Sequence, residues 1–110
     1  MSGWFELHRN DKGHFHFVLK AGNAETILSS QVYRVKRSAL KGIASVQSNG
    51  LDETRFERKT AKNGKPYFDL KAANHQVIGT SQMYSTEAHR EVGIASVKTN
   101  AASKQVKVVP

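Results

Sequence analysis

The residues best suited to metal chemistry in this sequence are three histidines near its start. His14 and His16 stand two positions apart, which places both on one face of a strand, close enough to share a metal ion. His8, on a neighbouring strand, would be the third ligand. The positions 51 residues later hold Lys65 and Tyr67, so the histidine pair does not recur with the rest of the chain. We therefore predict surface histidines, with no metal and no cofactor.

Two glutamates that do recur, Glu6 and Glu57, raise the question of acid–base catalysis. Two carboxylates related by a pseudo-twofold axis would resemble a general acid and base. A cross-strand lysine, Lys20 or Lys71, is the simpler partner for each. The sequence contains no glycine-rich phosphate loop, nucleophile elbow or metalloprotease helix. We predict no catalytic residue and a non-enzymatic protein that acts by binding or assembly. An enzyme or small-ligand carrier with its site at the seam between the two halves remains an alternative.

The best candidate binding surface is a set of polar residues that occurs in both halves. It comprises Lys20 and Lys71, Asn23 and Asn74, Ser30 and Ser81, Gln31 and Gln82, and Tyr33 and Tyr84, with Tyr67 as an exposed ring. Asparagine and serine also suit turns and caps, and the tyrosines suit packing at the rim of a core. The two lysines are harder to explain by structure alone. On an open sheet face with His16 and Tyr67, they would offer phosphate contacts and a stacking platform.

The chain is basic, with a formal net charge of +8. Residues 1–51 carry seven Lys/Arg against three Asp/Glu, and residues 52–110 ten against six, so each half contributes +4. Dispersed lysines serve solubility, but they also permit an acidic protein partner or nucleic acid. The nucleic-acid alternative uses two groups of residues. These are Lys20, Lys71, Arg58, Lys59 and Lys65 on the sheet, and Arg34, Lys36, Arg37 and Lys41 on a helix. Exposed sheet edges would serve a protein partner instead.

An internal duplication must position all of these residues. The pentapeptide Gly-Ile-Ala-Ser-Val at 42–46 recurs at 93–97, and the 51-residue offset aligns the two halves without a gap. We assign residues 1–51 to a first repeat and 52–110 to a second. Each half alone is marginal for a stable core, so the two should close on a pseudo-twofold axis as one domain. Because this arrangement already buries the faces that single copies would pair, we predict a monomer with pseudo-dimeric halves.

Hydrophobic periodicity predicts the elements of each repeat. We expect strands at 4–9, 14–20, 25–29, 54–60, 65–71, 76–80 and 105–109, and helices at 35–48 and 86–99. Gly13 should adopt positive φ in the first turn, and Gly22 or Asn23 a left-handed conformation in the second. Gly42 inside a helix indicates close approach of that helix to the sheet, and Asn49-Gly50 should end it. Runs of strands punctuated by helices give an α+β fold.

Composition limits the setting of the protein. The sequence has no cysteine, which rules out disulfides and cysteine-based zinc sites and suits a reducing compartment. No apolar run approaches the length of a membrane span, and the start lacks the pattern of a signal peptide. We expect a cytoplasmic protein with no membrane contact.

Several segments resemble the YegP family of small bacterial proteins, which contain one or two copies of a domain of unknown function. They are Gly-Trp-Phe-Glu-Leu, Phe-Val-Leu-Lys-Ala-Gly-Asn, Lys-Ala-Ala-Asn-His, Ser-Gln-Met-Tyr and the doubled Gly-Ile-Ala-Ser-Val. The resemblance covers nearly the whole chain, apart from the tail after Asn100. It implies tandem β3-α-β units that share one mostly antiparallel sheet, with two helices on one face and the C-terminal strands exchanged between the units. It implies no activity, cofactor or catalytic residue.

Overall fold

A computed structural model describes residues 3–110, so Met1 and Ser2 of the first repeat lie outside the described residues. The elements are β1 (Trp4–Arg9), β2 (Phe15–Lys20), β3 (Thr26–Ser29), α1 (Lys36–Asn49), the 3-10 turn η1 (Glu53–Arg55), β4 (Phe56–Thr60), β5 (Pro66–Lys71), β6 (Val77–Thr80), α2 (Glu87–Asn100) and β7 (Val106–Val109). All of the predicted strands and helices are present. Neither helix in residues 3–110 has the length and apolar character needed to cross a membrane.

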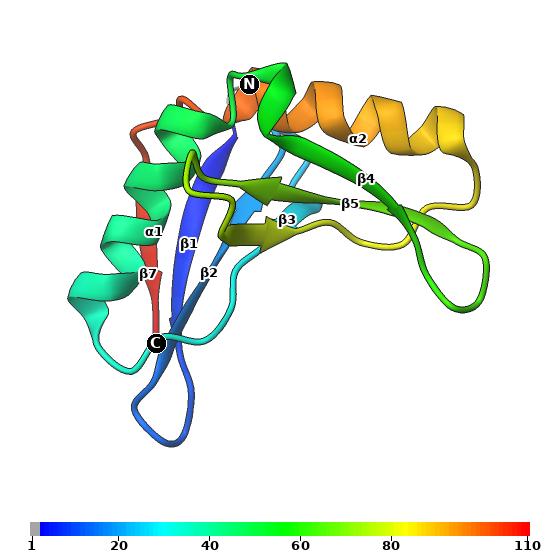
Figure 1. The fold of residues 1–110 in the computed structure, drawn as a ribbon. Helices are drawn as coiled ribbons and strands as arrows, with labels where there is room; N and C mark the ends of the chain where they lie inside the picture. The colour runs from blue at the N-terminus through cyan, green and yellow to red at the C-terminus, as the bar shows by residue number, and fades with distance from the viewer. Residues whose placement is uncertain (1–2) are drawn as a thin grey trace.

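The strands form a single sheet in the order β4-β5-β6-β3-β2-β1-β7 (Figure 1). The pairs are antiparallel except for β1 and β7, which run parallel. Strand β7 follows α2 in the second repeat but pairs with β1 of the first, with Phe5 opposite Val106. The C-terminal strand therefore crosses to the other repeat, and the mostly antiparallel α+β fold is confirmed.

Both helices cover the same face of the sheet (Figure 1). Alternation along the strands supplies that face with aromatic and aliphatic side chains, and Phe5, Phe17 and Phe68 have no exposed surface. The rings meet edge to face in each repeat, at 6.1 Å for Phe5–Phe17 and 5.7 Å for Phe56–Phe68. The helices close this core with Ile43 and Val46 and with their repeats, Ile94 and Val97. The opposite sheet face has no helix over it, and we call it the open face.

The pseudo-twofold axis passes between the repeats where Ser29 of β3 lies opposite Thr80 of β6. Close to the axis the two halves differ: Leu28 is buried, and the position 51 residues later is Gly79. A Cβ on Gly79 would lie 2.6 Å from Cγ of Leu28. One leucine therefore occupies the space that two related side chains would contest, which explains why the repeat is broken there.

The glycines inside the helices are needed because tyrosine rings lie against them. A Cβ on Gly42 would lie 2.6 Å from the Tyr33 hydroxyl and 2.7 Å from Cε2 of Phe17. Tyr33 stacks on Phe17 at 6.2 Å, and Tyr84 on Phe68 at 6.3 Å. The predicted close approach is therefore to aromatic side chains, and in α2 the nearest atoms to Gly93 are all from Tyr84.

One prediction about local backbone conformation was wrong. Gly13 and Gly64 do adopt positive φ, but in the second turn of each repeat the left-handed residues are Ala24 and His75, both at φ 70°. The asparagine one position earlier accepts a hydrogen bond from the backbone two residues on, as Asn23 Oδ1 does from Glu25 N at 3.1 Å, which leaves the following residue to reverse the chain. Helix α1 ends at Asn49 as predicted, with Gly50 as its C-cap in a right-handed conformation, φ −67°.

Candidate functional site

The recurring glutamates lie on the open face, and Glu57 has the lysine partner that the sequence predicts. Lys71 Nζ is 2.6 Å from Glu57 Oε2. Lys59 Nζ lies 3.1 Å from Glu57 Oε1 and 2.7 Å from Oδ2 of the buried Asp69. The hydrogen bond from Lys71, followed by that from Lys59, lowers the pKa of Glu57. Carboxylates thus neutralise the lysines of the second repeat's open face, and Tyr67 lies half-buried beside them, opposite Lys59.

The open face of the first repeat is built from different side chains. Glu6 accepts hydrogen bonds from Trp4 Nε1 at 2.9 Å and pairs with His8 Nε2 at 3.1 Å, and the tryptophan bond is the largest cause of its lowered pKa. The rings of His8 and His16 stack at 5.0 Å, and burial followed by the charge of His8 lowers the pKa of His16. Lys107 lies 4.4 Å above the Trp4 ring.

The histidines do not assemble with a third ligand. His14 precedes β2, and within residues 3–110 no three His, Asp, Glu or Cys side chains are placed to hold a metal. Sequence reasoning missed Trp4 as an open-face residue, although Trp4, Glu6 and His8 occupy alternate positions of one strand and so face the same side of the sheet. This alternation was the signal in the sequence that could have placed Trp4 on the open face.

Most of the doubled polar residues make local structural contacts. Asn23 and Asn74 each accept one backbone hydrogen bond inside their turns. Ser30 Oγ accepts from Phe17 N at 2.9 Å and donates to Gln31 O at 2.7 Å, and Ser81 does the same for the second repeat. Tyr33 and Tyr84 pack on the core as described above.

Ser30, Gln31, Ser81 and Gln82 are the members of the set that the structure brings together. They line one groove of about 460 Å³ across the pseudo-twofold axis, with Ser29 and Thr80 between the repeats. Lys20 and Lys71 do not line this groove. The predicted binding set is therefore distributed over turns, core and groove, and it does not form a single site.

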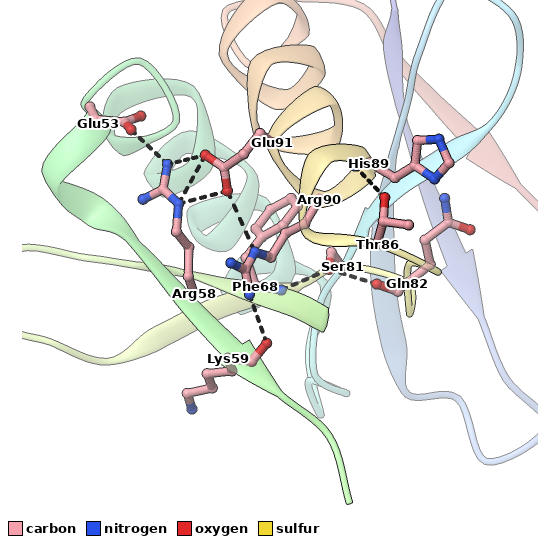
Figure 2. A network of polar contacts seen from close by, with 10 residues as sticks. All are labelled: Glu53, Arg58, Lys59, Phe68, Ser81, Gln82, Thr86, His89, Arg90 and Glu91. Carbon is pink, nitrogen blue, oxygen red and sulfur yellow. Dashed lines mark hydrogen bonds and ion pairs between the residues drawn. The ribbon is translucent and has the colours of Figure 1, made fainter. Parts of the chain in front are cut away.

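A second ion-pair network ties α2 to the free edge at β4 (Figure 2). Arg58 is held between Glu91, at 2.6 Å, and Glu53, at 2.8 Å, and Arg90 Nη1 donates to the backbone oxygen of Lys59 at 3.2 Å. The hydrogen bonds from Arg58 lower the pKa of both carboxyl groups. Arg58 was a candidate for nucleic-acid contact, and here its charge is already satisfied.

This network predicts a pH-dependent stability. Glu91 has a pKa below its ordinary value near 4.5, so its stabilising effect is present above that value and is lost as pH falls through the lower folded pKa. Glu91→Gln should therefore reduce the free energy of unfolding at pH 7 and have little effect at pH 3. With half-exposed side chains, the difference should stay below about 1 kcal/mol. Urea unfolding of both proteins at the two pH values measures it, and an equal gap at both would contradict this origin.

The lysines and arginines of the first repeat, in contrast to Arg58, are not paired with carboxylates among residues 3–110. In the described part of the first repeat, no Lys or Arg forms an ion pair, whereas Arg55, Arg58, Lys59, Lys71, Arg90 and Lys98 of the second repeat all do. Arg34, Lys36, Arg37 and Lys41 are exposed at the start of α1, and residues 26–51 contain no Asp or Glu. We call these four residues the α1 basic surface.

The local structure of α1 is unfavourable for positive charge. Its N-cap, Val35, makes no side-chain cap, and its first turn has no acidic residue, so Lys36 and Arg37 stand at the positive end of the helix dipole. The corresponding helix α2 has the Thr86 cap, which accepts from His89 N, and Glu87 in its first turn. Arg37 and Lys41 are also one turn apart, where like charges repel. A bound anion would relieve each of these costs.

A third feature is a cavity of about 590 Å³ at the seam between the repeats. Glu25 and Ile27 line it from the first repeat, and Lys65, Tyr84 and His89 from the second. Ser85 Oγ lies 3.0 Å from His89 Nδ1, the spacing of a nucleophile and its base. In residues 3–110 no carboxylate pairs with His89, so the group that would orient such a base is missing.

Comparison with known proteins agrees with the duplication and the fold. The domain of unknown function DUF1508 matches the chain twice, at residues 10–57 and 61–107. The UPF0339 protein YegP of Escherichia coli K12 is 64% identical over 107 residues, 97% of each chain, and a UPF0339 protein of Acinetobacter baylyi is 59% identical, covering 97% of this chain and 96% of its own.

Solved structures show the same arrangement. The solution NMR structure of yegP from E. coli, a protein of unknown function, superposes with a TM-score of 0.92 at 63% identity, covering 98% of this chain and 93% of its own. A UPF0339 protein from Shewanella oneidensis gives 0.92 at 55% identity, covering 98% and 92%. Two matched copies and near-full-length identity lead to one conclusion: the chain belongs to the YegP-like UPF0339 family, built on the DUF1508 domain of unknown function.

Proposed function

We propose that the protein is a non-enzymatic module that binds nucleic acid through the α1 basic surface. The observation that carries this proposal is the contrast between the repeats: the cations of the α1 basic surface have no carboxylate partner in the described chain, while six of the ten cations of the second repeat are paired. Unpaired lysine and arginine side chains on one helix suit the closely spaced phosphates of a nucleic-acid backbone.

The same contrast argues against the open face as the main contact surface. Lys59 and Lys71 would have to break short bonds to Asp69 and Glu57 before they could meet phosphate. Lys20 has no ion pair among the described residues, but it stands alone opposite Trp4. A nucleic acid on that face would meet carboxylates, which repel it.

The α1 basic surface should recognise phosphate density and not base sequence. It contains no aromatic side chain on which a base could stack. We therefore expect duplexes, which carry more charge per unit length, to bind more tightly than single strands. About four phosphate contacts predict a salt slope near −3.5, or a loss of roughly 100-fold in affinity between about 50 and 200 mM salt.

Fluorescence anisotropy with labelled DNA and RNA, single- and double-stranded, tests these expectations. Affinity that falls with the predicted slope and favours duplexes would support the proposal. Affinity that is independent of salt, or absent at about 50 mM, would overturn it and turn the search to protein partners.

A small-ligand carrier is the second candidate, because the seam cavity is lined by both repeats. Glu25 and Lys65 would contact charged groups of a ligand, and Met83 and Val92 its apolar body. Ser85 and His89 are exposed and flank the start of α2, where His89 N donates to the capping hydroxyl of Thr86. Their contact is therefore explained by the structure of the helix start, which favours a carrier over an enzyme.

A further inference from the structure

The outer edge of β7 is an unpaired strand edge with its hydrogen-bonding groups free. Phe5 N donates to Gln105 O at 2.9 Å, and Phe5 lies opposite Val106 in the parallel ladder. In such a ladder alternate residues turn their N–H and C=O groups toward the partner strand. The backbone groups of Val106 and Val108 therefore point away from β1, toward solvent.

An apolar groove lies beside this edge, on the helix-covered side of the sheet. It has a volume of about 360 Å³, and its apolar walls include Leu7, Phe15 and Val108. Val108 is 65% exposed, although Leu7 opposite it in β1 is buried. Arg9 and Lys36 form the basic part of the lining.

The opposite end of the sheet, at β4, shows how this protein closes a free edge; β4 is the repeat of β1, the strand that β7 covers at its own end. The position corresponding to Leu7 is Arg58, which is fixed between Glu91 and Glu53 (Figure 2). The position corresponding to Lys36 is Glu87. Charged groups paired with one another protect an edge from added strands. The β7 edge has no such network in the described residues; its cations are unpaired and its groove is apolar.

From this asymmetry we propose that the β7 edge binds an extended segment of a partner protein, as an added strand that carries both apolar and acidic residues on the face it turns toward the groove. Backbone groups of the segment would pair with Val106 and Val108, and its apolar side chains would enter the groove. Alternate residues of a strand share one face, so acidic residues two positions from the apolar ones would meet Arg9 and Lys36 in the same groove. A second copy of this chain is a poorer occupant, because twofold pairing of β7 edges would bring the same cations together.

The probe is a short capped peptide in which valine and glutamate take turns at every second position and threonine fills the positions between them. It is titrated into the isotope-labelled full chain and followed by amide chemical shifts and hydrogen exchange. We expect shifts centred on β7 and slowed exchange at the amides of Val106 and Val108. The same peptide with lysine in place of each glutamate should bind at least about tenfold more weakly.

Val108→Pro removes one outward N–H without removing a bond to β1, and should weaken peptide binding about tenfold. Val108→Thr keeps the N–H and a branched side chain and should bind as the native protein does. If Val108→Pro proves unfolded by its amide spectrum, Lys36→Glu takes its place, with the same expected loss.

Three results would overturn the proposal: no peptide binding, equal binding of both peptides, or native affinity in the folded Val108→Pro variant. A dimer in sedimentation that dissociates in Val108→Pro would show that a second copy occupies the edge, which also contradicts an acidic partner. Lys36 belongs to both proposed surfaces, but Arg37 and Lys41 do not line the groove, so Arg37→Glu/Lys41→Glu should leave the peptide affinity unchanged and separates the two proposals.

Discussion

Replacing Arg37 and Lys41 together with glutamate is expected to weaken nucleic-acid binding on the order of 100-fold at about 50 mM salt. The two side chains lie one turn apart on the exposed side of α1 and have no acidic residue near them in sequence. Removing two phosphate contacts should also lower the salt slope by about two. Anisotropy titrations across salt concentrations measure both quantities.

A matched control changes the net charge by the same amount elsewhere. Lys62→Glu/Lys65→Glu reverses two exposed cations in and beside the β4–β5 turn, away from α1. If α1 is the contact surface, this variant should lose only a small part of the affinity. Equal losses in the two variants would mean that net charge alone drives binding and would remove the basis for a site on α1.

Exchanging Leu28 and Gly79 is expected to restore most of the stability that either single change removes. Leu28→Gly empties a fully buried position and should cost at least about 3 kcal/mol. Gly79→Leu places a side chain where a Cβ alone would lie 2.6 Å from Leu28, with an expected cost of about 1–3 kcal/mol. In the double variant one leucine again fills the space near the axis, from the other repeat.

Urea unfolding of the four proteins completes a double-mutant cycle for this pair. The pseudo-twofold account predicts a large favourable coupling, with the exchanged variant near the native free energy of unfolding. If the losses of unfolding free energy in the two single variants simply add in the double variant, the positions on the two sides of the axis are not interchangeable. The composition is the same in the native and exchanged proteins, so glycine entropy does not bias the comparison.

The duplication made most of this fold predictable. Alternation located the strands, and the repeated glycine in each helix marked a close contact. The contact partner was not predictable, because nothing in the spacing shows that the Tyr33 and Tyr84 rings lie against the helix glycines. The left-handed Ala24 and His75 were also missed, since the side chain of the preceding asparagine decides which residue reverses the chain.

The candidate site was less predictable than the fold. Counting charges gave each repeat +4, but a charge count cannot show which cations are paired. That depends on register: Glu57 lies opposite Asp69, and Lys59 reaches both carboxylates. The absence of acidic residues from 26–51 was visible in the sequence and was the signal for the α1 basic surface.

Amide chemical-shift mapping of the full chain with a short DNA duplex tests the central claim most directly. The account predicts shifts concentrated on residues 34–41, with small changes at Lys20, Tyr67 and Lys71 on the open face. Shifts centred on the open face, or none at low salt, would contradict binding through α1.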